Sequence, residues 1–162
     1  MIVTSETSHI WDLLQRAYEG DAWHGPALRE LLENVTPQQA AARPIAGAHT
    51  IWELCGHIAV YEDQVRRRLL GESAHDLPED EAFPKVEDTS PAAWHRTLET
   101  FEAGHLALRR ALSDFPEERL GECVPGREYP YYLMLHGVVQ HDLYHAGQIA
   151  LLLRAQGARP PG

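Results

Sequence analysis

The segment at residues 130–156 constrains the fold of this chain most strongly, because it is predicted as a helix that is apolar on nearly every side. Its leucine, valine and isoleucine residues leave no continuous polar face, and Gly157 follows it as a helix stop signal. A helix of this kind is stable only when other elements cover it. The sequence therefore predicts a structure in which amphipathic segments surround this one.

Three further segments carry the amphipathic pattern that is needed to cover it. Residues 8–34 hold two apolar stripes, separated by a break that contains glycine and proline. Residues 50–71 begin with a capping-box pattern at Thr50 and Glu53 and continue with apolar residues at spacings of three and four. Residues 90–115 form an apolar seam whose spacings alternate between four and three, as in a coiled coil.

The connections between these segments define the expected topology. No segment alternates between polar and apolar residues in the manner of a β-strand. The acidic, proline-containing stretch at residues 72–89 is too long for a tight turn and suggests a connection that spans a bundle. We therefore expect an all-α fold: a four-helix bundle with a long crossover between helices 2 and 3, in a single domain over residues 1–162.

The charge of the chain limits its partners. It has 24 acidic and 14 basic residues, which gives a formal net charge of −10 at neutral pH. Such a chain repels phosphate backbones and anionic bilayers, so we expect a small-molecule substrate and neither nucleic acid nor membrane as a partner. With no apolar run of membrane-spanning length, no secretory signal pattern and only Cys55 and Cys123, the expected location is the cytoplasm.

The histidines carry the clearest chemical signal, because the chain has 10 of them. His141 and His145 are four residues apart in the most apolar helix, so both can point at one spot. His57 lies on the edge of the apolar stripe of residues 50–71. Three neutral imidazoles in a mostly dry core are a natural site for a divalent cation with a position open to water. The alternative is that they are polar core residues bonded to helix carbonyls or water, with His57 partly buried at the surface.

A di-iron site is a competing interpretation. Glu102 and His105, and also Glu6 and His9, match the Glu-x-x-His spacing of ferritin-like bundles. That site also needs carboxylates from the other helices, but the last predicted helix has no Glu and its only Asp is Asp142. The sequence therefore disfavours di-iron, and His105 is interpreted as a core residue with a hydrogen bond.

Four residues are predicted to line a pocket beside the three histidines. Gln148 lies one turn after the second of the paired histidines, and Glu53 and Tyr61 lie four residues on either side of His57. His24 lies in the break of the first helix, at about the same level along the bundle as His57. It is expected to form part of the pocket wall; a solvated kink is the alternative. No catalytic side chain is assigned.

The chain resembles the DinB/YfiT-like metalloenzyme family at residues 22–29, 48–58 and 135–149, the last reading LHGVVQHDLYHAGQI. The resemblance implies a four-helix bundle with a long second crossover and frequent dimers. It implies one divalent metal, variously nickel, zinc or iron. Related branches transfer low-molecular-weight thiols such as bacillithiol or mycothiol, and some are called hydrolases. The metal ligands that the resemblance implies are His57, His141 and His145.

Three functions follow as hypotheses. The first is a metal-dependent enzyme, most simply a transferase that joins a low-molecular-weight thiol to an electrophilic substrate, with metal-dependent hydrolysis as the next choice. The second is a non-catalytic module that binds a metal or a small ligand. The third is a structural bundle whose histidines bind adventitious metal.

A homodimer is also expected. A four-helix bundle buries only part of each helix, so the leftover apolar surface of residues 130–156 calls for a second copy. Small residues in that segment permit close helix approach: Gly137, Ala146, Gly147 and Ala150. The alternative is that the crossover covers this surface.

Overall fold

The computed structural model describes residues 5–72 and 75–158, and no β-strand is present within these residues. The all-α prediction is confirmed, but the described part of the chain holds seven α-helices and one short 3-10 helix rather than four helices. Residues 1–4, 73–74 and 159–162 of the expected domain lie outside the described residues. The helices are α1 (Glu6–Glu19), α2 (Leu28–Leu32), α3 (Pro37–Ala41), α4 (Ile51–Leu69), α5 (Glu79–Ala82), α6 (Pro91–Ser113), η1 (Glu117–Arg119) and α7 (Tyr131–Ala155).

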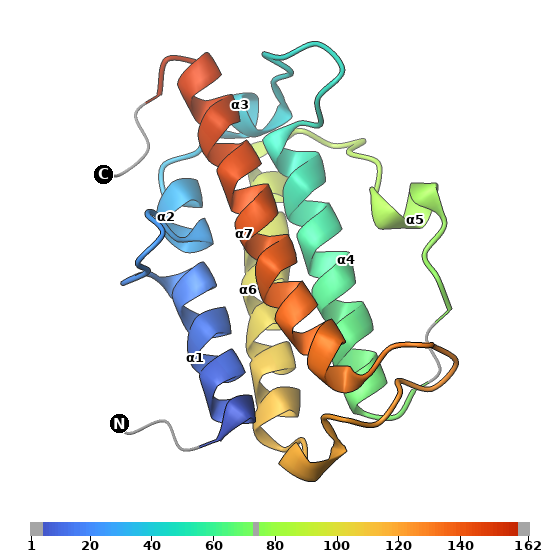
Figure 1. Ribbon diagram of the computed structural model, residues 1–162. Helices are drawn as coiled ribbons and strands as arrows, with labels where there is room; N and C mark the ends of the chain where they lie inside the picture. The colour runs from blue at the N-terminus through green and yellow to red at the C-terminus, as the bar shows by residue number, and fades with distance from the viewer. Residues whose placement is uncertain (1–4, 73–74, 159–162) are drawn as a thin grey trace.

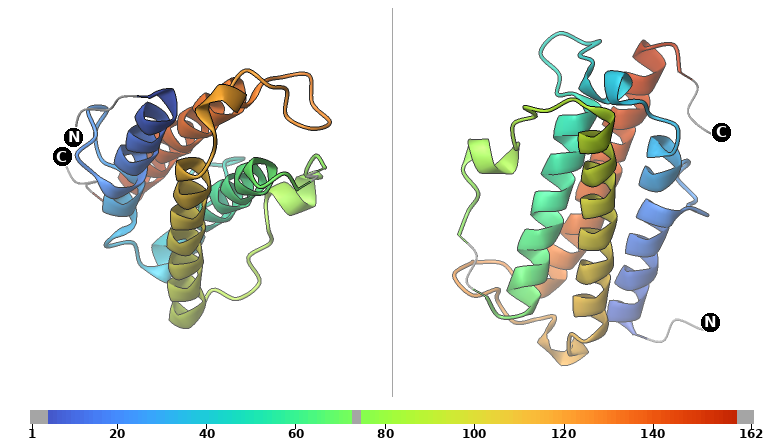
Figure 2. Two further views of the ribbon diagram at one scale, coloured as in Figure 1. Left: turned by 90° about the horizontal axis from the view of Figure 1, so that it is seen from below. Right: turned by 180° about the vertical axis from the view of Figure 1, so that it is seen from behind.

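The four longest helices lie side by side (Figures 1 and 2). Both α1 and α4 pack against α6 and α7. Helices α1 and α4 therefore occupy opposite corners of the four-helix arrangement. The short helix α2 follows α1 and also packs against α7. The connection from α4 to α6 carries α5, which packs against the outer side of α4 (Figure 1).

Hydrogen-bonding caps set where the long helices begin. The Thr50 hydroxyl accepts from the Glu53 backbone N–H at 3.1 Å, and the Glu53 carboxylate accepts from the Thr50 backbone N–H at 2.9 Å. The Ser90 hydroxyl accepts from the Ala93 backbone N–H at 3.2 Å, and Pro91 occupies the first helical position of α6. Both of these starts are where the sequence places them.

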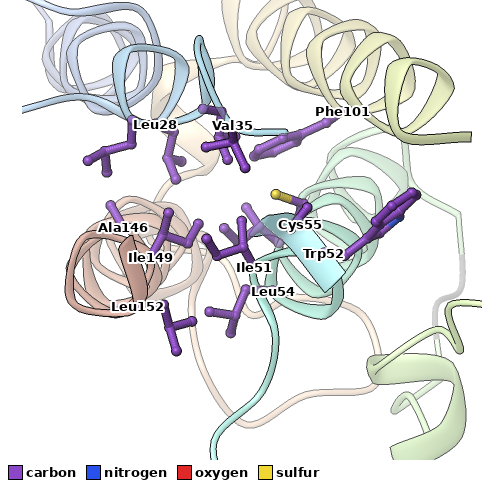
Figure 3. Packing of buried hydrophobic residues seen from close by; sticks show 14 of the residues in the cluster. Leu28, Val35, Ile51, Trp52, Leu54, Cys55, Phe101, Ala146, Ile149 and Leu152 are labelled. Atoms are coloured by element: carbon purple, nitrogen blue, oxygen red, sulfur yellow. The ribbon is translucent and has the colours of Figure 1, made fainter. Parts of the chain in front are cut away.

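The apolar core consists of two clusters stacked along the bundle. One cluster lies toward α2, α3 and the N-terminal half of α4, and includes Leu28, Ile51, Phe101 and Ile149 (Figure 3). The other lies toward the opposite end, between α1, the C-terminal halves of α4 and α6, and the first half of α7. Three fully buried polar side chains, Glu62, His105 and Asp142, lie at the level between the two clusters.

The last helix is not covered on every side by the rest of its own chain. Leu133, Tyr144 and Leu151 of α7 are more than half exposed, at 56%, 66% and 55%. Because the α4–α6 connection lies against α4, it leaves this face of α7 open (Figure 1). Among the described residues, no helix combines the length and the apolar character that a membrane span requires.

Removal of the Thr50 cap should destabilise the fold. Thr50→Ala leaves the first turn of α4 without its side-chain acceptor, which costs about 1 kcal/mol of unfolding free energy. Urea denaturation measures the change. The control is Thr100→Ala on the exposed side of α6, where the expected change is within about 0.5 kcal/mol. Equal stability of the two variants would contradict the role of the cap.

Candidate metal centre

Three histidine side chains meet where α4 packs against α7. His57 comes from α4, and His141 and His145 come from successive turns of α7. The Nε2 atoms of His57 and His141 are 3.0 Å apart, and the ring centroid of His145 lies 4.7 Å from that of His57 and 4.5 Å from that of His141. One ring nitrogen from each residue lies within 4.8 Å of the other two. The structure therefore brings together all three residues that the sequence suggests as ligands.

Hydrogen bonds on the outer side of two rings fix which nitrogen faces the centre. Nδ1 of His57 donates to the backbone carbonyl of Ala82 in α5 at 2.7 Å, and Nδ1 of His145 donates to Oε1 of Gln148 at 2.8 Å. Each bond places the ring proton on Nδ1 and leaves the lone pair on Nε2, toward the centre. Metal-ligating histidines commonly have an outer partner of this kind.

Burial keeps the three imidazoles neutral. Loss of hydration lowers the pKa of His141 to about 3, with further lowering by its two histidine neighbours. Burial is also the largest cause that lowers the pKa of His57 and of His145. Neutral imidazole is the form that binds a metal ion. The site therefore presents three lone pairs at neutral pH.

The donor set and spacing fit a divalent cation. Two nitrogens on a tetrahedral ion at ordinary zinc–nitrogen distances are about 3.3 Å apart, close to the 3.0 Å between the Nε2 atoms of His57 and His141. Three imidazoles suit zinc, nickel and iron, and they leave at least one coordination position open. The buried triad can therefore hold a metal ion.

Two of the four predicted pocket residues lie at the triad. The Tyr61 ring centroid is 4.7 Å from that of His57 and 4.8 Å from that of His141, and this side chain is 37% exposed, so it stands between the triad and solvent. Gln148 is also adjacent, but it lies behind His145 as the acceptor for Nδ1. It supports the ring rather than lining a pocket in front of it.

The other two predicted pocket residues, Glu53 and His24, make no hydrogen bond or ion pair with the three histidines within the described part of the chain. The carboxylate of Glu53 accepts from the Thr50 backbone and from Arg43 at 2.7 Å, so capping and charge pairing occupy it. His24 is exposed in the connection between α1 and α2. The place of His24 in the pocket wall stays a prediction.

The α4–α6 connection contributes residues that sequence reasoning missed. The Phe83 ring stacks on His57 at a centroid distance of 3.9 Å and on His49 at 3.8 Å. Together with the Ala82 carbonyl, it fixes the plane of the His57 ring. No periodic pattern marks this segment, so the only available signal was the isolated aromatic residue within an acidic stretch.

A cavity of about 270 Å³ lies beside the triad, between α4 and α7. Tyr61 and His141 border it, and most of its wall is apolar, including Val65, Met134 and Val138. At another part of the wall, the Arg68 guanidinium donates to the Tyr129 hydroxyl at 3.0 Å. The cavity offers space for a small organic molecule next to an open metal position.

The family comparison covers this site. The sequence model of the DinB superfamily matches residues 22–149, a range that contains all three histidines, and the chain belongs to this superfamily. Among curated proteins and solved structures, none matches the chain significantly.

The outer hydrogen bond of His145 gives a direct prediction. Gln148→Ala removes the acceptor for Nδ1, so the ring is no longer held with Nε2 toward the centre, and Zn²⁺ affinity should fall about 10–100-fold. Competition with a chromogenic chelator measures the dissociation constant. Gln140→Ala is the matched control, because Gln140 is exposed on the same helix. Equal affinity of the two variants would show that this hydrogen bond does not orient a ligand.

Proposed function

We propose that this protein is a metal-dependent transferase that joins a low-molecular-weight thiol to an electrophilic small molecule. The observation that carries the proposal is the convergence of ring nitrogens from three neutral imidazoles, two of which are held by hydrogen bonds from Nδ1. His57, His141 and His145 would hold one nickel, zinc or iron ion. When bound, this ion supplies positive charge that lowers the pKa of a thiol in the open position.

The chain's own side chains support thiol transfer in two ways. The apolar cavity beside His141 would position the hydrophobic part of the electrophile, and Tyr61 would limit the entry of water. The protein's own thiols do not compete as nucleophiles near the triad. Cys55 is buried in the apolar core, where burial raises its pKa, and Cys123 is exposed in the segment before α7.

Metal-dependent hydrolysis is the weaker proposal, because it calls for a general base beside the open position. Neither of two candidate carboxylates suits this role, because Glu53 caps α4 and Asp142 is fully buried. A non-catalytic module that binds metal or a small ligand is the outcome if neither reaction is found.

The finer features of the fold fit the same proposal. The four long helices would act as a four-helix bundle within one domain, and the α4–α6 connection would be the crossover that supports His57 through Ala82 and Phe83. Both cysteines are free, as expected of a protein in the reducing cytoplasm, where small thiols are abundant.

The activity should depend on the triad. His141→Ala and metal removal by a chelator should each abolish conjugation of a low-molecular-weight thiol with an aromatic halide, and added divalent metal should restore activity to the chelated wild type. His95→Ala, an exposed histidine on α6, is the control and should retain full activity. The rate is measured by absorbance as the thiol is consumed. The thiols tested form a panel that includes bacillithiol and mycothiol. Activity that survives both chelation and His141→Ala would exclude a metal-dependent reaction.

We also propose a homodimer in which α7 packs against α7 of a second copy. The open face of this helix carries a stripe with alternating spacings of four and three, typical of a helix–helix seam. At both of its glycines, no heavy atom lies within 4 Å of an added Cβ, so a second helix has room to approach. Ala146, expected in the same role, lies instead in the core. The stripe consists of Leu133, Gly137, Gln140, Tyr144, Gly147 and Leu151.

A charge placed in this stripe should separate the two copies. Light scattering should give twice the chain mass of 18.2 kDa for the wild type and the single-chain mass for Leu151→Glu. Leu106→Glu, at an exposed leucine of α6, should leave the dimer intact. A wild-type mass of one chain at micromolar concentration would contradict the dimer.

A further inference from the structure

A second cluster of metal-binding side chains lies inside the bundle, apart from the three histidines. Glu62 of α4, His105 of α6 and Asp142 of α7 are each 0% exposed. On all three helices, apolar residues of one core cluster precede the polar residue and those of the other cluster follow it. The three side chains therefore form a polar layer between two apolar clusters.

The hydrogen bonds within this polar layer are incomplete. His105 Nδ1 donates to Glu62 Oε1 at 2.7 Å. Glu62 Oε2, His105 Nε2 and both carboxylate oxygens of Asp142 are buried, and no hydrogen-bond donor of the described chain reaches them. These four atoms all offer lone pairs. One potential ligand atom from each of the three residues lies within 4.8 Å of the other two, so the three side chains lie close enough to bind one ion.

Two buried carboxylates without a counter-charge are costly, and a positive species between them removes that cost. A divalent cation balances the two carboxylates, and the neutral imidazole adds a third ligand without changing the charge. The ring of His105 is held for this role by the Tyr18 ring, which stacks on it at 4.3 Å with an interplanar angle of 18°. Mixed oxygen and nitrogen donors suit Mn²⁺ and Fe²⁺ better than three imidazoles do.

The alternative occupant is a proton. The two carboxyl groups are close enough to hydrogen-bond through a shared proton. Such a proton would join Glu62 to Asp142 but would leave His105 Nε2 without a donor. A cation bound to all three residues would balance both carboxylates and use the free lone pair of His105, and for that reason we favour it over a proton.

We propose that Glu62, His105 and Asp142 form a second, buried metal site that takes one Mn²⁺ or Fe²⁺ ion per chain. The two clusters adjoin through neighbouring residues of α7, with His141 Nδ1 and Asp142 Oδ1 3.8 Å apart, but they share no ligand. The second site therefore does not rest on the proposed transferase function. Because its residues are fully enclosed, the ion is expected to enter as the protein folds.

The test is the metal content of untagged protein purified from cells grown with added MnCl₂, measured by mass spectrometry. His57→Ala, which disables the three-histidine site, should retain one manganese per chain with the low-temperature paramagnetic spectrum of bound Mn²⁺. Glu62→Gln in the same background keeps the acceptor for His105 and should lose that manganese. Asp63→Asn, which changes the neighbouring half-exposed residue, is the control and should retain the manganese.

The outcomes separate the two sites. If His57→Ala purified in this way is folded, as judged by circular dichroism, and holds no manganese, the second site is excluded and a shared proton accounts for the carboxyl pair. If Glu62→Gln fails to fold, the manganese content of the His57→Ala protein alone still decides the question. If His57→Ala instead retains as much metal as the wild type, the second site stands and the three-histidine site is the proposal that fails.

Discussion

The packing of α4 against α7 is the interaction on which the rest of the structure depends. It buries apolar residues of both helices, and the same contact brings His57 against His141 and His145. Burial of an apolar side chain contributes about 1.5–3 kcal/mol, whereas an unpartnered buried polar group costs about 1–3 kcal/mol. A helix as apolar as α7 can therefore hold several enclosed polar residues and still remain in place. Those residues are concentrated in one stretch of its sequence, where both candidate sites lie.

The features that repeat along the sequence were the ones that could be predicted from it. The capping pattern at Thr50 marked the start of α4, and Ser90 with Pro91 marked the start of α6, because both depend on residues within one helical turn. His141 and His145 could be placed on one face because their spacing is that of a helical turn. His57 could be placed toward them only because it follows an apolar stripe that has to face the core.

Two kinds of feature could not be predicted: the side of the bundle on which a connection lies, and the contacts made by segments without regular secondary structure. His24 was placed by its level along the bundle, and an equal level does not fix the side of the bundle on which its turn lies. Ala82 and Phe83 support His57 from a connection that has no periodicity. In α4 the hydrophobic pattern gave no sign of a buried acid, but in the structure Tyr61 is partly exposed and the neighbouring Glu62 is buried. Hydropathy could not indicate this, because Glu62 is enclosed together with polar partners from two other helices.

The central claim is that the Nε2 atoms of His57, His141 and His145 together bind one metal ion. A crystal structure of zinc-loaded protein, with anomalous data collected across the zinc absorption edge, tests it most directly. The account predicts an anomalous peak within bonding distance of all three Nε2 atoms, with His57 Nδ1 still donating to the Ala82 carbonyl. A zinc-loaded crystal with no peak at the triad, or with a peak bound through Nδ1 of a flipped ring, would contradict it.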